Sequence, residues 1–225
     1  MSEREELDGL LAAAGVDEAY RARMSAFGAS LLEANRRFNL TGAKTPATLA
    51  PHILDALTLL PEVEGRTIDV GSGGGFPGIP LLLAGATVDF LEANAKKCGF
   101  LGEQIAAFGV EATVYCGRAE VLGRDPNLRE RYDRAVARAV ASATTVAEYL
   151  VPFLRIGGVA LMPRGRAEEG EEAAIADAAL VLGAEPIEEI RLEGDRRIVR
   201  LRKLRPTPER FPRRTGIPST KPLCR

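Results

Sequence analysis

The segment from Thr67 to Gly78 constrains the fold more than any other part of the chain. It reads T-I-D-V-G-S-G-G-G-F-P-G, so a β-branched apolar run ends in an acidic residue and is followed by four glycines within five positions. Glycine places no side chain in the way of an approaching ligand, and Pro77 suits the first turn of a helix. The pattern predicts a strand, a ligand-binding loop and a helix, in that order.

Two classes of cofactor site use this arrangement, and the same glycines fit either. Gly73, Gly75 and Gly78 have the G-x-G-x-x-G spacing of a dinucleotide site. Asp69 followed by Gly71, Gly73 and Gly75 has the spacing typical of methyltransferases that use S-adenosylmethionine (SAM). A carboxylate would repel a pyrophosphate, whereas it attracts the ammonium group of SAM. The residues therefore favour SAM and leave NAD, or a loop that only turns the chain, as alternatives.

From Arg66 onward, strand and helix patterns alternate. We expect strands near residues 67–70, 87–91, 111–116, 133–138, 156–162, 186–191 and 196–204, with helices between the first six. Only Glu193-Gly194-Asp195 separates the last two strands, which predicts an antiparallel hairpin. The predicted fold is α/β of the class I methyltransferase (Rossmann-like) type. It has a seven-stranded, mostly parallel sheet with helices on both faces.

Three regions are expected along the chain. Residues 1–62 carry apolar side chains at helical spacing and predict an N-terminal helical cap, and residues 63–205 form the SAM-binding core. Residues 206–225 form a basic tail that packs on the core or extends it. From Arg191 to Arg225 there are twelve Lys or Arg against three Asp or Glu, although the net charge of the chain is only −1. This basic segment suits contact with a nucleic acid or protection of an exposed sheet edge, and both readings stay open.

Composition narrows the classes of function. The chain has neither a long apolar run nor an N-terminal signal peptide pattern, so we expect a cytoplasmic protein without membrane contact. Cys98, Cys116 and Cys224 lack metal-ligand spacing and are expected to be reduced and without a metal. His52 is the single histidine, which argues against enzymes that need a His-containing catalytic triad or a His-rich metal site.

The ends of the later strands supply further candidate residues. Glu92 lies 21 positions after Gly71, where a carboxylate can bind both ribose hydroxyls of a nucleoside, although an acid there can also serve the start of the next helix. Arg138 ends a predicted apolar strand, where a charge requires a partner. It is a candidate for the site, or for a buried ion pair with Asp69, Glu92 or Glu120.

Motifs along most of the chain resemble one family, the RsmG (GidB) methyltransferases of small-subunit ribosomal RNA. They are F-N-L-T-G at 38–42, H-I-L-D-A-L at 52–57, D-V-G-S-G-G-G-F-P-G-I-P at 69–80, K-K-C-G-F-L at 96–101, G-R-A-E at 117–120, A-R-A at 137–139, G-G-V-A-L-M-P-R-G at 157–165 and P-R-R-T-G-I-P-S-T-K-P-L at 212–223. The resemblance implies transfer of a methyl group from SAM to N7 of a guanine in the 530 loop of 16S rRNA (guanine 527 in the usual numbering).

The resemblance also implies where the cofactor contacts fall. It places them at Gly71, Phe76, Ala119, Glu120 and Arg138. The sequence pattern itself adds four more expected cofactor-binding residues: Asp69, Ser72, Gly73 and Glu92. The sequence departs from the family pattern at Ala137, where serine is common, at Arg164, where lysine is common, and at Glu92, where aspartate is frequent.

No residue is expected to act as a general base, because guanine N7 already carries a free lone pair. Catalysis can then depend on positioning. Candidates for positioning the substrate are Asn39, His52, Asp55, Lys96, Arg118 and Arg164. The expected partner is 16S rRNA, the 30S subunit or an assembly intermediate, and the expected state is a monomer. A non-catalytic SAM-binding RNA module is the alternative function, with an NAD-dependent dehydrogenase behind it.

Overall fold

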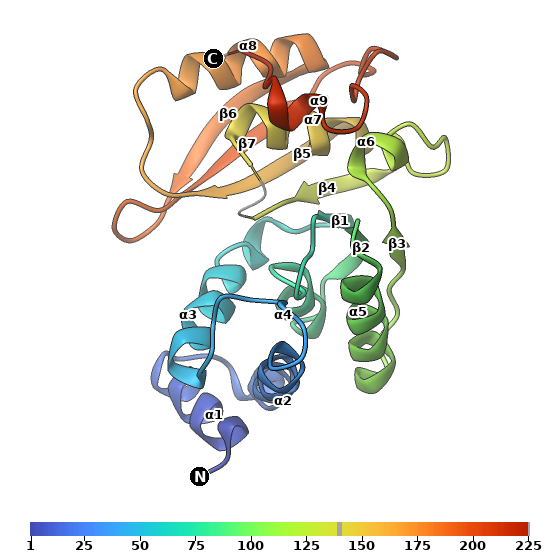
Figure 1. Ribbon diagram of the computed structural model, residues 1–225. Coiled ribbons are helices and arrows are strands. Elements are labelled where there is room, and N and C mark those ends of the chain that lie inside the picture. Colours follow the sequence, from blue (N-terminus) through green and yellow to red (C-terminus); the bar gives the residue numbers. More distant parts are fainter. Residues whose placement is uncertain (139–140, 225) are drawn as a thin grey trace.

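A computed structural model describes residues 1–138 and 141–224 as one sheet with helices on both faces (Figure 1). Ala139 of the expected A-R-A motif and Arg225 of the expected tail lie outside the described residues. The helices are α1 (Glu3–Ala13), α2 (Glu18–Asn35), α3 (Pro46–Leu57), α4 (Gly78–Leu83), α5 (Ala95–Phe108), α6 (Ala119–Leu122), α7 (Ala143–Leu150), α8 (Glu171–Leu182) and α9 (Ile217–Thr220), with 3-10 turns at Leu60–Glu62 and Val151–Phe153.

The strands are β1 (Arg66–Val70), β2 (Thr87–Glu92), β3 (Val114–Cys116), β4 (Tyr132–Val136), β5 (Leu154–Arg164), β6 (Ala184–Arg191) and β7 (Arg197–Lys203). They form one seven-stranded sheet in the order β3-β2-β1-β4-β5-β7-β6. The first five strands pair in parallel, whereas β7 is antiparallel to both β5 and β6. The predicted fold class and the terminal hairpin are confirmed.

Two details differ from the predicted strands. The third strand was expected from residue 111, but it begins at Val114. The amide of the preceding Thr113 donates to the side chain of Asp89 on β2 and not to a main-chain carbonyl of that strand. The basic strand β7 was considered as a sheet edge. It lies between β5 and β6, so edge protection by β7 is wrong, and β6 is the edge on that side.

The helices before the sheet form because their ends are capped and one side of each is apolar. Ser2 and Glu5 form a capping box at α1, and Thr45 caps α3 directly before a proline at the first helical position. On α2, Phe27 and Leu31 are fully buried. These helices pack on α4 and on one face of the sheet, with which they share a continuous apolar core.

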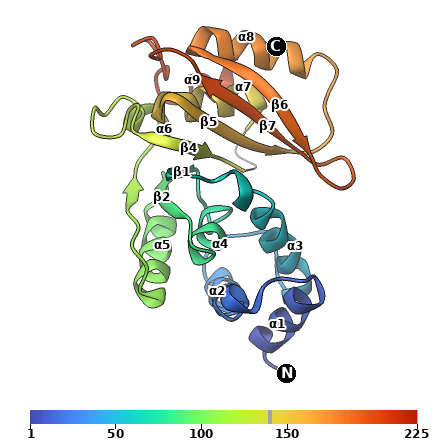
Figure 2. The same ribbon diagram turned by 180° about the vertical axis from the view of Figure 1, so that it is seen from behind.

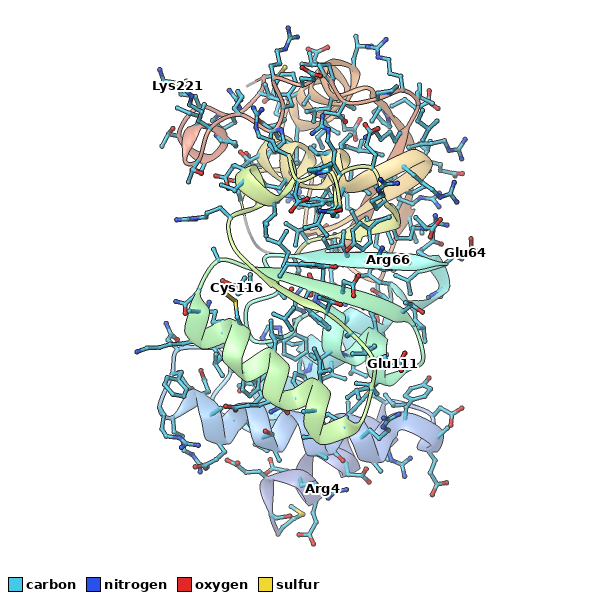
Figure 3. All side chains as sticks on the ribbon, turned by 90° about the vertical axis from the view of Figure 1, so that its right-hand side faces the viewer. Arg4, Glu64, Arg66, Glu111, Cys116 and Lys221 are labelled. Carbon is cyan, nitrogen blue, oxygen red and sulfur yellow. A yellow bond between two sulfur atoms is a disulfide. The ribbon has the colours of Figure 1, made fainter. Side chains whose placement is uncertain are left out.

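Helices α7 and α8 cover the opposite face of the sheet and form a second apolar core with β4, β5 and β7 (Figure 2). The parallel strands all end at one edge, so the loops that follow β1, β2, β4 and β5 gather there. Figure 3 shows the direction of the sheet: Arg66, at the start of β1, lies on one side of the view, and Cys116, at the end of β3, lies on the other with Lys221 of the tail above it. The site lies at the edge marked by Cys116.

Candidate functional site

A cavity of about 520 Å³ opens at the carboxyl ends of β1, β2 and β4. The glycine-rich loop after β1 forms its floor, and the segment Gly117–Glu120 forms another wall. Apolar residues from the cap and from the strand ends, Leu40, Val70 and Leu91, line it beside carboxylates. A pocket of this size with an apolar lining and a few fixed polar groups suits a nucleoside-sized ligand.

The glycine loop takes a path that side chains would block. Gly71 has a φ of 78°, in the left-handed region, and its amide donates to the Leu91 carbonyl at 2.7 Å. A Cβ at Gly74 would lie 2.8 Å from the Leu40 carbonyl oxygen, so the helical cap approaches the loop at this position. The loop is thus held between β2 and the cap.

Glu92 connects this loop with the next helix. Its carboxylate accepts one hydrogen bond from the Gly73 amide at 2.9 Å and another from the Asn94 amide at 2.8 Å. The side chain is buried and lines the cavity. A carboxylate has four lone-pair directions, so Glu92 keeps acceptor capacity for a ligand. Asn94 caps α5 itself, by accepting from the Lys96 and Lys97 amides.

Asp69 lies beneath the loop instead of in the cavity wall. It is fully buried, and its Oδ2 accepts from the Gly78 amide at 3.0 Å. Among the described residues its Oδ1 has no hydrogen-bond partner. Burial raises the pKa of Asp69 to about 7, although the Gly78 amide and the Arg138 charge act in the opposite direction. Asp69 therefore joins the loop to the start of α4.

Phe76, Arg138 and Asp55 form a stack that connects the cavity wall, which Phe76 and Arg138 line, with α3 of the cap, which carries Asp55. The Arg138 guanidinium lies over the Phe76 ring, 4.9 Å from its centroid, and pairs with Asp55 at 3.1 Å. The sequence suggested Asp69, Glu92 or Glu120 as the ion-pair partner of Arg138. In the structure the partner is Asp55. His52 packs beside the same ring, and burial, followed by the Arg138 charge, lowers the pKa of His52, which keeps the imidazole neutral at pH 7.

The C-terminal tail completes the cavity. Gly216 and Ser219 line it together with Tyr149, and the Gly216 amide donates to the buried carboxylate of Glu120 at 3.0 Å. Arg213 anchors the segment by a bidentate pair with Glu148, whose side chain has no exposed surface.

The structure gathers most of the expected site residues but not all of them. Lining the cofactor cavity are Gly71, Ser72, Gly73, Phe76, Glu92, Arg118, Ala119, Glu120 and Arg138. Asp55 and Arg164 line a second, adjoining cavity of about 440 Å³. Within the described chain, Asp69, Asn39, His52 and Lys96 line neither.

Lys97, Tyr149, Gly216 and Ser219 also line the cofactor cavity, and sequence reasoning did not include them among the candidate cofactor-binding residues. The specific tail motif R-T-G-I-P-S at 214–219 was the signal that could have indicated Gly216 and Ser219.

The expectation that all cysteines stay reduced is contradicted. The structure pairs Cys98, in the first turns of α5, with Cys116, at the end of β3, as a disulfide (Figure 3). Their Cα atoms are 5.9 Å apart, because β3 runs beside β2 and ends next to the start of α5. Cys224 is free. The sequence contains no signal for this pair, because the two cysteines are 18 residues apart and only the fold brings them together.

Two negative findings apply to residues 1–138 and 141–224. None of the helices there has the length and apolar character needed to cross a bilayer. In the same ranges, His, Cys, Asp and Glu side chains form no group of three or more that could hold a metal ion.

The sequence is similar to known proteins over most of its length. The model of the family described as "GidB: rRNA small subunit methyltransferase G" matches residues 21–199. "Ribosomal RNA small subunit methyltransferase G" of Rubrobacter xylanophilus is 41% identical and spans 92% of this chain and 90% of its own length. The protein of the same name from Roseiflexus castenholzii is 39% identical, over 92% of this chain and 94% of its own length.

Solved structures with low identity share the fold. A putative RNA methyltransferase from Pyrococcus horikoshii has a TM-score of 0.52 at 18% identity, over 74% of this chain and 88% of its own. A mutant of MtNAS in complex with S-adenosylmethionine has a TM-score of 0.54 at 16% identity, over 89% of this chain and 84% of its own.

Proposed function

This chain belongs to the rRNA small subunit methyltransferase G (GidB) family, and on that premise we propose that it methylates N7 of a guanine in the 530 loop of 16S rRNA with SAM as the donor. The observation that carries the proposal is the match to relatives of that name over nine-tenths of both chains. The membership also favours the SAM reading of the glycine loop over the dinucleotide reading.

The cofactor cavity fits the donor by the chemistry of its lining. Glu92 supplies acceptors where the two ribose hydroxyls of SAM would donate, and Leu40, Val70 and Leu91 supply apolar surface for the adenine. Glu120 and the tail close the cavity from the other side. SAM, when bound, supplies an electrophilic methyl group on a sulfonium. Asp69 supports the loop from beneath, a role that replaces direct contact with the ammonium.

The residues at the cavity mouth suit a transfer that requires no base. Guanine N7 attacks with its own lone pair, so the protein's task is to hold the base in line with the methyl group. Orientation of this kind contributes up to roughly 7 to 11 kcal/mol to lowering a barrier. In the Phe76–Arg138–Asp55 stack one guanidinium contacts both the ring and the carboxylate. We assign this stack the positioning of the guanine, with the neutral His52 behind the ring.

The test is methyl transfer from labelled SAM into 30S subunits and into naked 16S rRNA, both lacking the modification. Nuclease mapping would then identify the labelled nucleoside. The expected result is 7-methylguanosine in the 530 loop, and the better substrate of the two shows at which stage of subunit assembly the enzyme acts. If the label is found at another nucleotide, the proposed target is wrong and that nucleotide is the target. SAM binding without transfer to either RNA would favour the non-catalytic RNA module. A monomer acting in the cytoplasm is part of the same proposal.

A further inference from the structure

The second cavity adjoins the cofactor cavity and shares Arg138 with it. Its charged lining is Arg138, Arg164, Arg166 and Arg196 with Asp55 and Glu168, and we call it the arginine cavity. Arg138 follows β4, Arg164 ends β5, and Arg196 lies at the tip of the β6–β7 hairpin, so all three come to the edge of the sheet that carries the cofactor site.

The charges in this cavity do not cancel. Asp55 accepts from Arg138 at 3.1 Å and from Arg196 at 3.2 Å, so one carboxylate is shared between two guanidiniums. Arg166 is exposed, and its side chain makes no hydrogen bond or ion pair with the described residues. The lining holds four arginines and two carboxylates, and Glu171 behind it pairs with Arg164, so four positive charges face three negative ones and one positive charge is in excess beside a space of about 440 Å³. That excess selects an anionic ligand.

Contacts behind the lining hold the cavity in shape. Arg164 donates to the Ala141 carbonyl at 2.9 Å and pairs with Glu171 at 3.0 Å. The buried Arg197 also pairs with Glu171 and donates to the Gly165 carbonyl at 3.1 Å. The end of β5 is therefore fixed before any ligand arrives. An anion bound there therefore has to order only the exposed arginine side chains and not the strand that carries the cavity.

We propose that the arginine cavity binds a phosphodiester of the RNA strand next to the target guanine. The inference rests on the proposed function. Because Arg138 lines both cavities, a guanine held at the Phe76–Arg138–Asp55 stack beside SAM would have its neighbouring phosphate close to the arginine cavity. Planar guanidiniums bind phosphate oxygens in pairs, so Arg166 and Arg196, the more exposed of the four, make the contacts. These contacts orient the strand and carry no sequence information.

The test compares Arg166→Gln and Arg196→Gln, singly and together, with Arg202→Gln as the matched control. Arg202 is exposed on β7 opposite Val159, midway along β5, whereas the arginine cavity lies at the end of β5 where Arg164 pairs with Arg197. Binding of unmodified 16S rRNA is measured by filter retention at several salt concentrations, and affinity for S-adenosylhomocysteine by calorimetry. Each single variant should reduce the magnitude of the slope of log affinity against log salt by about 0.7. The double variant should weaken RNA binding by about an order of magnitude. S-adenosylhomocysteine affinity should stay within about twofold of wild type.

The possible failures are distinguishable. If wild type transfers methyl groups but the cavity variants bind RNA with the affinity and salt slope of Arg202→Gln, the subsite is overturned and the proposed function stands. If the cavity variants lose S-adenosylhomocysteine affinity in proportion to RNA affinity, the arginines support the cofactor site, and the subsite is again overturned. If wild type neither binds nor methylates the RNA, both proposals fail. An Arg196→Lys variant should restore the salt slope but only part of the affinity, because lysine keeps the charge without the paired donors.

Discussion

At the scale of single residues, Glu92 determines the shape of the cofactor site. One carboxylate fixes the Gly73 amide and the Asn94 amide, so the loop after β1 and the start of α5 depend on the same side chain. The sequence indicated Glu92 as a ribose acceptor and, alternatively, as an acid at the start of a helix. In the structure Glu92 accepts from the Asn94 amide at the start of α5, and it also lines the cavity, where it can accept from a ribose.

Glu92→Gln should weaken S-adenosylhomocysteine binding by about tenfold or more. A glutamine offers one acceptor oxygen where two amides donate, so one partly buried amide loses its partner and the ribose loses a charged acceptor. Calorimetry measures the affinity, and Glu103→Gln, an exposed change on α5, is the control. Equal affinity of the two variants would contradict the assigned role.

Asp69→Asn should remove a pH dependence of stability. The unfolded carboxyl releases its proton near pH 4, whereas the folded one keeps it until about pH 7. Between these values the folded state binds more protons, so stability falls as pH rises through this window, by up to about 1.4 kcal/mol per pH unit. Urea unfolding at about pH 5 and about pH 7 should show this fall in wild type and a smaller one in the variant. Parallel pH profiles would show that Asp69 titrates normally.

At the scale of elements, the disulfide joins the start of α5 to the end of β3 beside the cofactor cavity. Reduction with dithiothreitol should lower the free energy of unfolding by about 3 kcal/mol, because the bond closes a short loop in the unfolded chain. The double variant Cys98→Ser with Cys116→Ser should then be insensitive to dithiothreitol, whereas Cys224→Ser should respond like wild type. If wild type has the same melting temperature with and without dithiothreitol, the disulfide does not form in solution.

The order of elements could be predicted because it depends on local patterns. Apolar runs, the glycine loop and the short hairpin gave all seven strands within a few residues. The place of β7 could not be predicted, since alternation of basic and apolar residues does not distinguish an edge strand from an inner one. It lies inside because β6 pairs with its other side, a long-range contact that periodicity does not contain.

At the scale of the whole molecule, the site consists of segments distant in sequence. Sequence patterns located the loop, Glu92, the Gly117–Glu120 segment and Arg138, since each follows a strand. The pairing of Arg138 with Asp55 and the return of the tail to Glu120 depend on packing of the cap and of the C-terminus. The division of the chain at residues 62 and 205 stays a prediction.

The tail anchor can be tested with neighbouring arginines. Arg213→Ala leaves the buried Glu148 without its charged partner, which should cost about 3 kcal/mol of stability and release Gly216 from the cofactor cavity. Arg214→Ala removes an exposed arginine one residue later and should change neither stability nor S-adenosylhomocysteine affinity. Thermal unfolding and calorimetry measure the two effects. If the two variants have the same stability and the same S-adenosylhomocysteine affinity, the tail does not contribute to cofactor binding.

The late position of this wall has a consequence during protein synthesis. The glycine loop at 71–75 is translated long before Gly216, yet both line one cavity. A nascent chain that still lacks Gly216 and Ser219 also lacks this wall. The cavity therefore becomes complete only after the segment that carries them has been translated and has packed against Glu120.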